Sequence, residues 1–120
     1  MNLQKEKYKP MTSYNKFKNK PQVVDDIRFD SIKEANRYSE LKLMLRENEI
    51  KDLECHPKIP LIVNDKKIGT YVADFRYYDN AFKKTIIEDV KSVATKTPVY
   101  NLKKKILATY TPPIEIVEIF

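Results

Sequence analysis

Two carboxylates and a lysine are the residues of this chain whose types and spacing best suit chemistry. Asp89, Val90 and Lys91 form an acidic, apolar and basic triplet, and Asp74 precedes them on another extended segment. In a strand, residues two apart share a face, so Asp89 and Lys91 project together. Carboxylate oxygens bind Mg²⁺, and a neighbouring ammonium can orient or help deprotonate an attacking water. The alternative is an ordinary charged strand, because such triplets are common by chance.

The hairpin between the two segments decides whether Asp74 can reach Asp89. Direct opposition requires paired residue numbers that sum to 163, with the hairpin centred between Ala81 and Phe82. A two-residue turn at Asp79-Asn80 would displace the two carboxylates by about 13 Å along the strand. We therefore expect a longer loop or a bulge.

Glu34 is a third candidate carboxylate, in a helix predicted from Ser31 to about Asn48. Steps of four and three lead from Glu34 to Tyr38 and Leu41, so Glu34 faces the same side as the apolar stripe. Ser31 and Glu34 also have the spacing of a capping box. Both roles, cap and metal ligand, stay open and do not exclude each other.

The composition argues against several other chemistries. His56 is the only histidine and Cys55 the only cysteine, which argues against a Cys/His zinc site and excludes an intrachain disulfide. His56 is a general-base candidate or, beside prolines, a structural residue. A single glycine cannot build a phosphate-binding loop, and no serine–histidine triad is apparent.

Length and hydropathy indicate one globular domain. The 120 residues are 42% apolar and 33% charged, and no stretch is apolar enough for a membrane span. The start of the chain has no signal-peptide pattern, and one cysteine suits a reducing cytosol. We expect a cytoplasmic protein with no membrane partner and no small-molecule cofactor.

The net charge of +6 favours a polyanionic partner, although a solubilising surface explains it equally well. Residues 1–21 hold six lysines against one acid and lack periodicity, so we expect a flexible basic arm or a plain disordered terminus. The folded domain is expected at 22–120.

The elements that position the candidate site follow the order β-α-β-β-β-α-β. This order predicts an α/β or α+β fold with a mixed sheet flanked by helices. Strands are expected at 23–29, with Asp25-Asp26 as a candidate turn inside it, and at 70–78, 82–93 and 114–120. Asn64-Asp65-Lys66 is a candidate hairpin turn between 61–63 and 67–68, and 52–56 is a short extended piece. Helices are expected at 31–48 and at 98–110, with Pro98 in the first turn.

Four stretches together resemble a known family: 29–35, 71–75, 88–92 and 100–105. They are similar to a phage and prophage family of small proteins grouped with the PD-(D/E)XK nucleases and related to Holliday-junction resolvases. The resemblance covers roughly residues 22–120. Ala73 stands where the superfamily motif has its proline, a position at which proline is often absent. His56 stands where relatives tend to carry glutamine.

The resemblance implies a restriction-endonuclease-like α-β-β-β-α-β core with Mg²⁺ or Mn²⁺ as cofactor. It implies Asp74, Asp89, Glu34 and the backbone carbonyl of Val90 as metal ligands, and Lys91 as the catalytic lysine. The leading hypothesis is an endonuclease that cuts four-way or branched DNA in phage recombination or packaging. The alternatives are a catalytically weak DNA-binding protein with this fold, or an RNA-processing or restriction-type nuclease.

Basic residues on both sides of the candidate site are the predicted DNA contacts. A solvated arm and an exposed helix face explain them almost as well. The predicted contacts are Lys16, Lys18, Lys20, Tyr100, Lys103, Lys104 and Lys105.

We predict that the protein is a homodimer. A symmetric four-way junction presents two equivalent scissile phosphates, and a two-fold dimer supplies two matching sites. Sedimentation at micromolar concentration should give the dimer mass. A monomer that still cleaves junctions would contradict this prediction.

Deletion of residues 1–20 should weaken DNA binding. The slope of log affinity against log salt should fall by about 0.9 for each phosphate that the shortened protein no longer neutralises. Cleavage at saturating DNA should change little, because the candidate catalytic residues lie elsewhere. Fluorescence anisotropy at several salt concentrations measures the affinity and its salt dependence. An unchanged affinity and salt dependence would show that the arm does not contact DNA.

Overall fold

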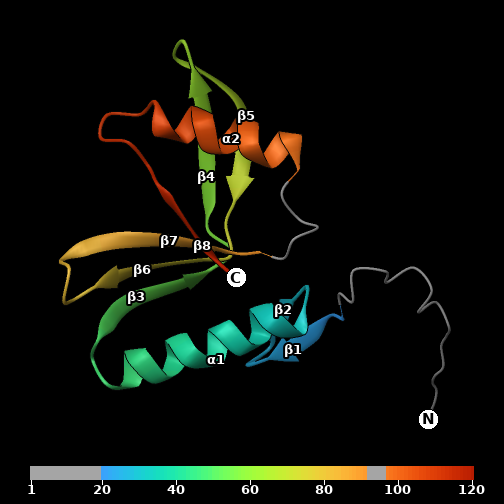
Figure 1. Ribbon diagram of the computed structural model, residues 1–120, viewed down its shortest axis with the longest axis vertical. Coiled ribbons are helices and arrows are strands. Elements are labelled where there is room, and N and C mark those ends of the chain that lie inside the picture. Colours follow the sequence, from blue (N-terminus) through green and yellow to red (C-terminus); the bar gives the residue numbers. More distant parts are fainter. Residues whose placement is uncertain (1–19, 92–96) are drawn as a thin grey trace, which may run out of the picture. The chain divides into compact units, whose positions relative to one another are not determined.

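A computed structural model of the chain describes residues 20–91 and 97–120 (Figure 1). These residues fall into two compact units, one that ends at Asn36 and one that comprises Arg37–Phe120. The predicted basic arm lies outside the described residues except for Lys20 and Pro21. Neither helix in the described ranges combines the length and hydrophobicity needed to cross a membrane.

The first unit contains a short hairpin where one strand was expected. β1 (Gln22–Val24) pairs antiparallel with β2 (Ile27–Phe29). Asp25 and Asp26 between them have φ of 53° and 63°. Aspartate tolerates this left-handed region better than most residues, and two successive such residues form the usual tight hairpin turn. The segment predicted as a strand at 23–29 is therefore two strands, and the turn predicted inside it at Asp25-Asp26 is confirmed.

Helix α1 (Ile32–Arg46) begins at the predicted cap and passes from the first unit into the second. The Glu34 N–H donates to Ser31 Oγ at 3.1 Å, which satisfies one of the free donors of the first turn. The helix ends two residues before Asn48, which has a φ of 61°. The predicted inner stripe is confirmed, since Ala35, Tyr38 and Leu41 are buried and Leu45 is partly buried.

A four-stranded mixed sheet forms the centre of the second unit. Its strands are β3 (Ile50–Cys55), β6 (Phe75–Asp79), β7 (Lys84–Val90) and β8 (Ile116–Ile119), in the order β3-β6-β7-β8. The first two pairings are antiparallel and β7–β8 is parallel. With its two helices, the fold is α+β.

Helix α2 (Pro98–Ala108) lies between the parallel strands in the sequence. Thr97 caps it by accepting the Tyr100 N–H at 3.1 Å, and Pro98 occupies the first helical position as predicted. Figure 1 shows α2 lying across the hairpin of β4 (Lys58–Val63) and β5 (Lys66–Val72). The buried core here joins the hairpin, the sheet and α2, through Ile59, Leu61, Tyr71, Ala73, Ile87, Tyr100, Leu107 and Ile116.

The β4–β5 hairpin turns at Asn64 and Asp65, as the sequence predicts. Their φ values of 51° and 64° are both left-handed, which a two-residue hairpin turn requires. The strand predicted at 70–78, in contrast, is divided between β5 and β6. The chain leaves one sheet for the other at Ala73 and Asp74, a change of neighbours that alternation alone does not reveal.

The opposite face of the four-stranded sheet is covered by the part of α1 in the same unit. Tyr38 stacks on Phe75 with ring centroids 6.4 Å apart. Arg37 donates to both carboxylate oxygens of Glu88, through Nε at 2.8 Å and Nη2 at 2.6 Å. Tyr77 donates its hydroxyl to the same carboxylate. The hydrogen bonds with Glu88 raise the pKa of Arg37 above its ordinary value, despite the opposing effect of burial.

Loss of the Arg37 fork should destabilise the fold strongly. Glu88 is only 1% exposed, so Arg37→Met leaves a buried carboxylate without its cation, at an expected cost of about 3 kcal/mol. Arg28→Met is the matched control, since Arg28 pairs with Asp30 on the exposed surface. That control should change stability by less than about 0.5 kcal/mol. Urea unfolding measures both, and equal losses would contradict the importance of the buried pair.

Candidate active site

The β6–β7 hairpin has the register that the candidate site needs. Phe75 pairs with Glu88 and Asp79 with Lys84, so paired residue numbers sum to 163. The regular pairing ends at Phe75–Glu88, and Asp74 is the residue directly before Phe75, next to the position that this register would pair with Asp89. The expected longer loop is confirmed, since four residues, 80–83, separate the two strands.

The loop is held by its own side chains. Asp79 Oδ1 accepts the N–H groups of Ala81 at 2.8 Å and Phe82 at 2.9 Å. Lys83 then takes a φ of 56° as the chain enters β7. This arrangement satisfies the loop donors without shortening the loop, and so maintains the register.

Asp74 remains bound to β7 just beyond the paired residues. Its N–H donates to the Glu88 carbonyl at 3.1 Å, and its Oδ2 accepts the Val90 N–H at 2.7 Å. Asp74 thus lies beside the triplet Asp89-Val90-Lys91. The predicted participation of the Val90 carbonyl as a ligand stays a prediction.

Asp89 is buried and held by two neighbours. It is 5% exposed, it accepts a hydrogen bond from the Tyr71 hydroxyl, and its Oδ2 lies 3.4 Å from Lys91 Nζ. Burial and the bond to Asp89 raise the pKa of Tyr71 far above its ordinary value. Tyr71 therefore acts as a neutral donor to this carboxylate.

Lys91 is buried between an anion and an aromatic ring. It is 8% exposed, and its Nζ lies 3.5 Å from the centroid of the Tyr100 ring. A ring face attracts a cation, so Tyr100 and Asp89 together fix the ammonium. The Lys91 N–H also donates to the Ile119 carbonyl at 2.7 Å, which ties its backbone to the end of β8.

Tyr100 links the site to β8. Its hydroxyl donates to Glu118 Oε2 at 2.7 Å, and Lys104 Nζ lies 3.2 Å from the same oxygen. Burial, and then the bond to Glu118, raise the pKa of Tyr100. The charges of Asp89 and Asp74 contribute to the same shift, and both also raise the pKa of Tyr71. The two carboxylates therefore act on one shared pair of tyrosines.

His56 is a site residue that the sequence left open. A ring nitrogen of His56 and a carboxylate oxygen of Asp74 lie within 4.8 Å of each other. The His56 N–H also donates to the Asp74 carbonyl at 2.9 Å. Sequence spacing does not predict this contact. The contact forms because the chain passes from β3 to β4 at His56 and returns from β5 to β6 at Asp74.

Glu34 is 7% exposed in the first turn of α1. Ser31 is confirmed as the cap, because its Oγ accepts the Glu34 N–H, and the capping role of the Glu34 side chain stays a prediction. Glu34 belongs to the other unit, and its participation with Asp74 and Asp89 stays a prediction.

The predicted DNA contacts differ in their exposure. Lys16 and Lys18 lie outside the described residues, whereas Lys20 and Lys105 are exposed. Lys103 Nζ donates to the Thr70 carbonyl at 3.1 Å, and Lys104 contacts Glu118. Tyr100 is buried and its ring contacts Lys91, and its contact with DNA stays a prediction.

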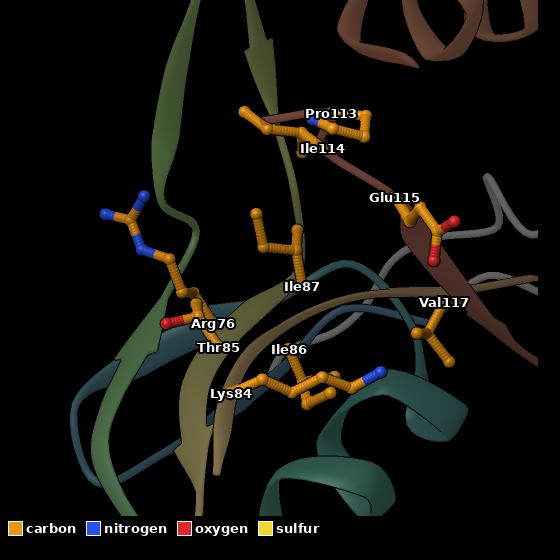
Figure 2. A pocket seen from close by; sticks show the side chains of 9 residues that line it. All are labelled: Arg76, Lys84, Thr85, Ile86, Ile87, Pro113, Ile114, Glu115 and Val117. Atoms are coloured by element: carbon orange, nitrogen blue, oxygen red, sulfur yellow. The ribbon is translucent and has the colours of Figure 1, made fainter. Parts of the chain in front are cut away.

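A separate cleft of about 460 Å³ lies farther along β7 (Figure 2). Ile87 and Ile114 line it, and the charged side chains of Arg76, Lys84 and Glu115 lie around them. Arg76 is already paired with Glu54, Nε to Oε1, at 2.7 Å. The cleft contains neither the candidate carboxylates nor Lys91, so we do not assign the chemistry to it.

Fold and site together define an α+β protein with an acidic and lysine-containing site on a mixed sheet. Residues 14–117 match the family described as Protein of unknown function (DUF1064), and the chain belongs to that family. Neither a curated protein nor a solved structure matches the chain.

The raised pKa of Tyr71 predicts a difference in alkaline stability. The folded chain keeps the phenol proton above pH 10.0, the ordinary pKa, whereas the unfolded chain releases it. The stability from Tyr71 is thus complete below that pH and is lost as the pH rises above it. Wild type should lose up to about 1.4 kcal/mol more per pH unit than Tyr71→Phe, because phenylalanine has no proton to release. Urea unfolding of both proteins at about pH 9 and about pH 11 measures this difference. An equal loss of stability in wild type and Tyr71→Phe would contradict a buried neutral phenol.

Proposed function

We propose that this chain is a metal-dependent DNA endonuclease of the PD-(D/E)XK type, selective for branched DNA such as four-way junctions. The observation that carries the proposal is the β6–β7 register. It brings Asp74 beside the triplet Asp89-Val90-Lys91, where Asp74 Oδ2 accepts the Val90 N–H, and strand alternation gives Asp89 and Lys91 a common face. Two carboxylates and a lysine at the end of a hairpin suit hydrolysis of a phosphodiester.

The order of the elements also supports this class. Without the β4–β5 hairpin, the chain from α1 onward reads α1-β3-β6-β7-α2-β8, which is the α-β-β-β-α-β order that the resemblance implies. The hairpin is then an insertion between β3 and β6. Asp74 directly precedes β6, Asp89 lies on β7 and Lys91 directly follows β7.

The donors present fit a hard divalent cation. Asp74 and Asp89 offer carboxylate oxygens, and their shared effect on Tyr71 and Tyr100 indicates one electrostatic site. Mg²⁺ or Mn²⁺ would be held by these two residues, with Glu34 and the Val90 carbonyl as further proposed ligands. When bound, such an ion supplies positive charge that stabilises the charge developing on the phosphate.

Lys91 has the position of a phosphate-binding and water-orienting group. Its ammonium is held beside Asp89 by the Tyr100 ring, so little rotational freedom remains to be lost when substrate binds. Burial strengthens its attraction for an anionic phosphate, because less water screens the charge. Exposed lysines, such as Lys105, would contact the DNA backbone at longer range.

A catalytically weak DNA-binding protein is the second candidate. The observation that favours it is that Asp89 already accepts a hydrogen bond from Tyr71 and forms an ion pair with Lys91. These two partners compensate the charge of the carboxylate without a metal ion. Such a protein would bind branched DNA without cutting it.

Cleavage assays on linear, flap and four-way DNA test the proposal. With Mg²⁺ or Mn²⁺ present, the wild type should cut branched DNA, and Asp74→Asn or Asp89→Asn should each reduce cleavage to background. Metal-free DNA binding should persist or strengthen, because a negative charge leaves the phosphate path. EDTA should also abolish cleavage.

Asp65→Asn is the matched control, because it removes one exposed carboxylate in the β4–β5 turn. Asparagine also tolerates the left-handed backbone there. This variant should retain full activity. Full activity of either site variant would overturn the assignment, and branched-DNA binding without any cleavage by wild type would favour the second candidate.

A further inference from the structure

His56 lies where the chain passes from β3 of the central sheet to β4 of the hairpin. The return passage runs through Ala73 and Asp74, between β5 and β6. Two backbone hydrogen bonds join the passages: His56 N–H to the Asp74 carbonyl at 2.9 Å, and Ala73 N–H to the Pro57 carbonyl at 3.1 Å. His56 is therefore fixed to the backbone of Asp74 and does not belong to an independent loop.

The His56 backbone adopts an uncommon conformation at this point. Its φ is 56°, in the left-handed region that costs energy for a residue with a side chain. The side chain is partly buried, and its nitrogen lies within 4.8 Å of an Asp74 carboxylate oxygen. Two bonds of about 2.2 Å to one cation span about 4.4 Å, so a side-chain shift of at most about 0.4 Å lets both atoms contact the same ion.

We infer that His56 is a nitrogen ligand of the cation held by Asp74, and that the site therefore favours Mn²⁺ over Mg²⁺. This inference rests on the proposed metal-dependent function. Mg²⁺ strongly prefers an all-oxygen shell, whereas first-row transition metals accept imidazole readily. A histidine beside Asp74 thus changes which divalent ion binds best.

A direct His56–Asp74 interaction without a metal is the competing explanation. In that case the imidazole would act on the carboxylate alone, and no nitrogen would enter the metal shell. Affinity alone does not separate the two explanations, because loss of either arrangement disturbs Asp74. A measurement that detects the metal–nitrogen bond is required.

Pulsed electron paramagnetic resonance of bound Mn²⁺ detects that bond. Coordinated imidazole ¹⁴N gives a characteristic modulation, and His56 is the only histidine of the chain, so the signal has one source in tag-free protein. We expect the modulation in the native protein. Protein labelled with ¹⁵N-histidine should give the ¹⁵N pattern in its place, and this control leaves the sequence unchanged.

Binding titrations with variants complete the test. His56→Asn keeps a residue type that tolerates left-handed φ, and should weaken Mn²⁺ about tenfold or more, the scale of losing a metal-site group. Mg²⁺ affinity should change much less. Asp74→Asn should reduce both affinities, and Asp65→Asn neither.

The outcomes separate this inference from the proposed function. Mn²⁺ that binds in an Asp74-dependent manner without nitrogen modulation would overturn the role of His56 and leave the proposed metal site intact. Absence of Asp74-dependent binding by either ion would overturn both. Equal loss of Mn²⁺ and Mg²⁺ affinity in His56→Asn would also contradict the selectivity.

Discussion

The register between β6 and β7 is the constraint on which the candidate site depends. Side chains alternate along a strand, so a slip of one residue would carry Asp89 and Lys91 to the other face of the sheet. The four-residue loop sets the register, and Asp79 holds the loop from within. Asn80 adds an external tie, with its Nδ2 donating to the Asn48 carbonyl at 2.8 Å. The turn that follows α1 thus helps to hold the β6–β7 loop, and with it the candidate residues.

Neighbouring acids on β7 have opposite surroundings because of the same alternation. Glu88 faces α1, where Arg37 and Tyr77 satisfy its oxygens. Asp89 faces the other side, where Tyr71 and Lys91 do so. Buried carboxylates are costly without such partners. The fork of Arg37 gives Glu88 a structural role, whereas the single hydroxyl and the ammonium beside Asp89 suit a site that exchanges ligands.

The β4–β5 hairpin contributes residues to the surroundings of both aspartates. Tyr71 reaches Asp89 from β5, and the Thr70 carbonyl accepts a bond from Lys103 of α2. The two chain passages that connect the hairpin to the central sheet bring His56 beside Asp74. The hairpin and its connections therefore supply both the donor to Asp89 and the histidine next to Asp74.

The sequence by itself determined the elements whose cause is local. The Ser31 cap, the apolar stripe of α1, the Asn64-Asp65 turn and the Pro98 helix start all depend on residues within a few positions of one another. The sequence also predicted that a site at Asp74 and Asp89 needs a loop longer than two residues. The numbers of paired residues in a hairpin have a constant sum, and this sum fixes the loop length. The tertiary structure decided the rest. The division of 70–78 between two sheets, the burial of Tyr100 beneath Lys91 and the pairing of His56 with Asp74 each join segments distant in the chain. Alternation and composition describe each segment separately, and they contain no information about which segment becomes its neighbour.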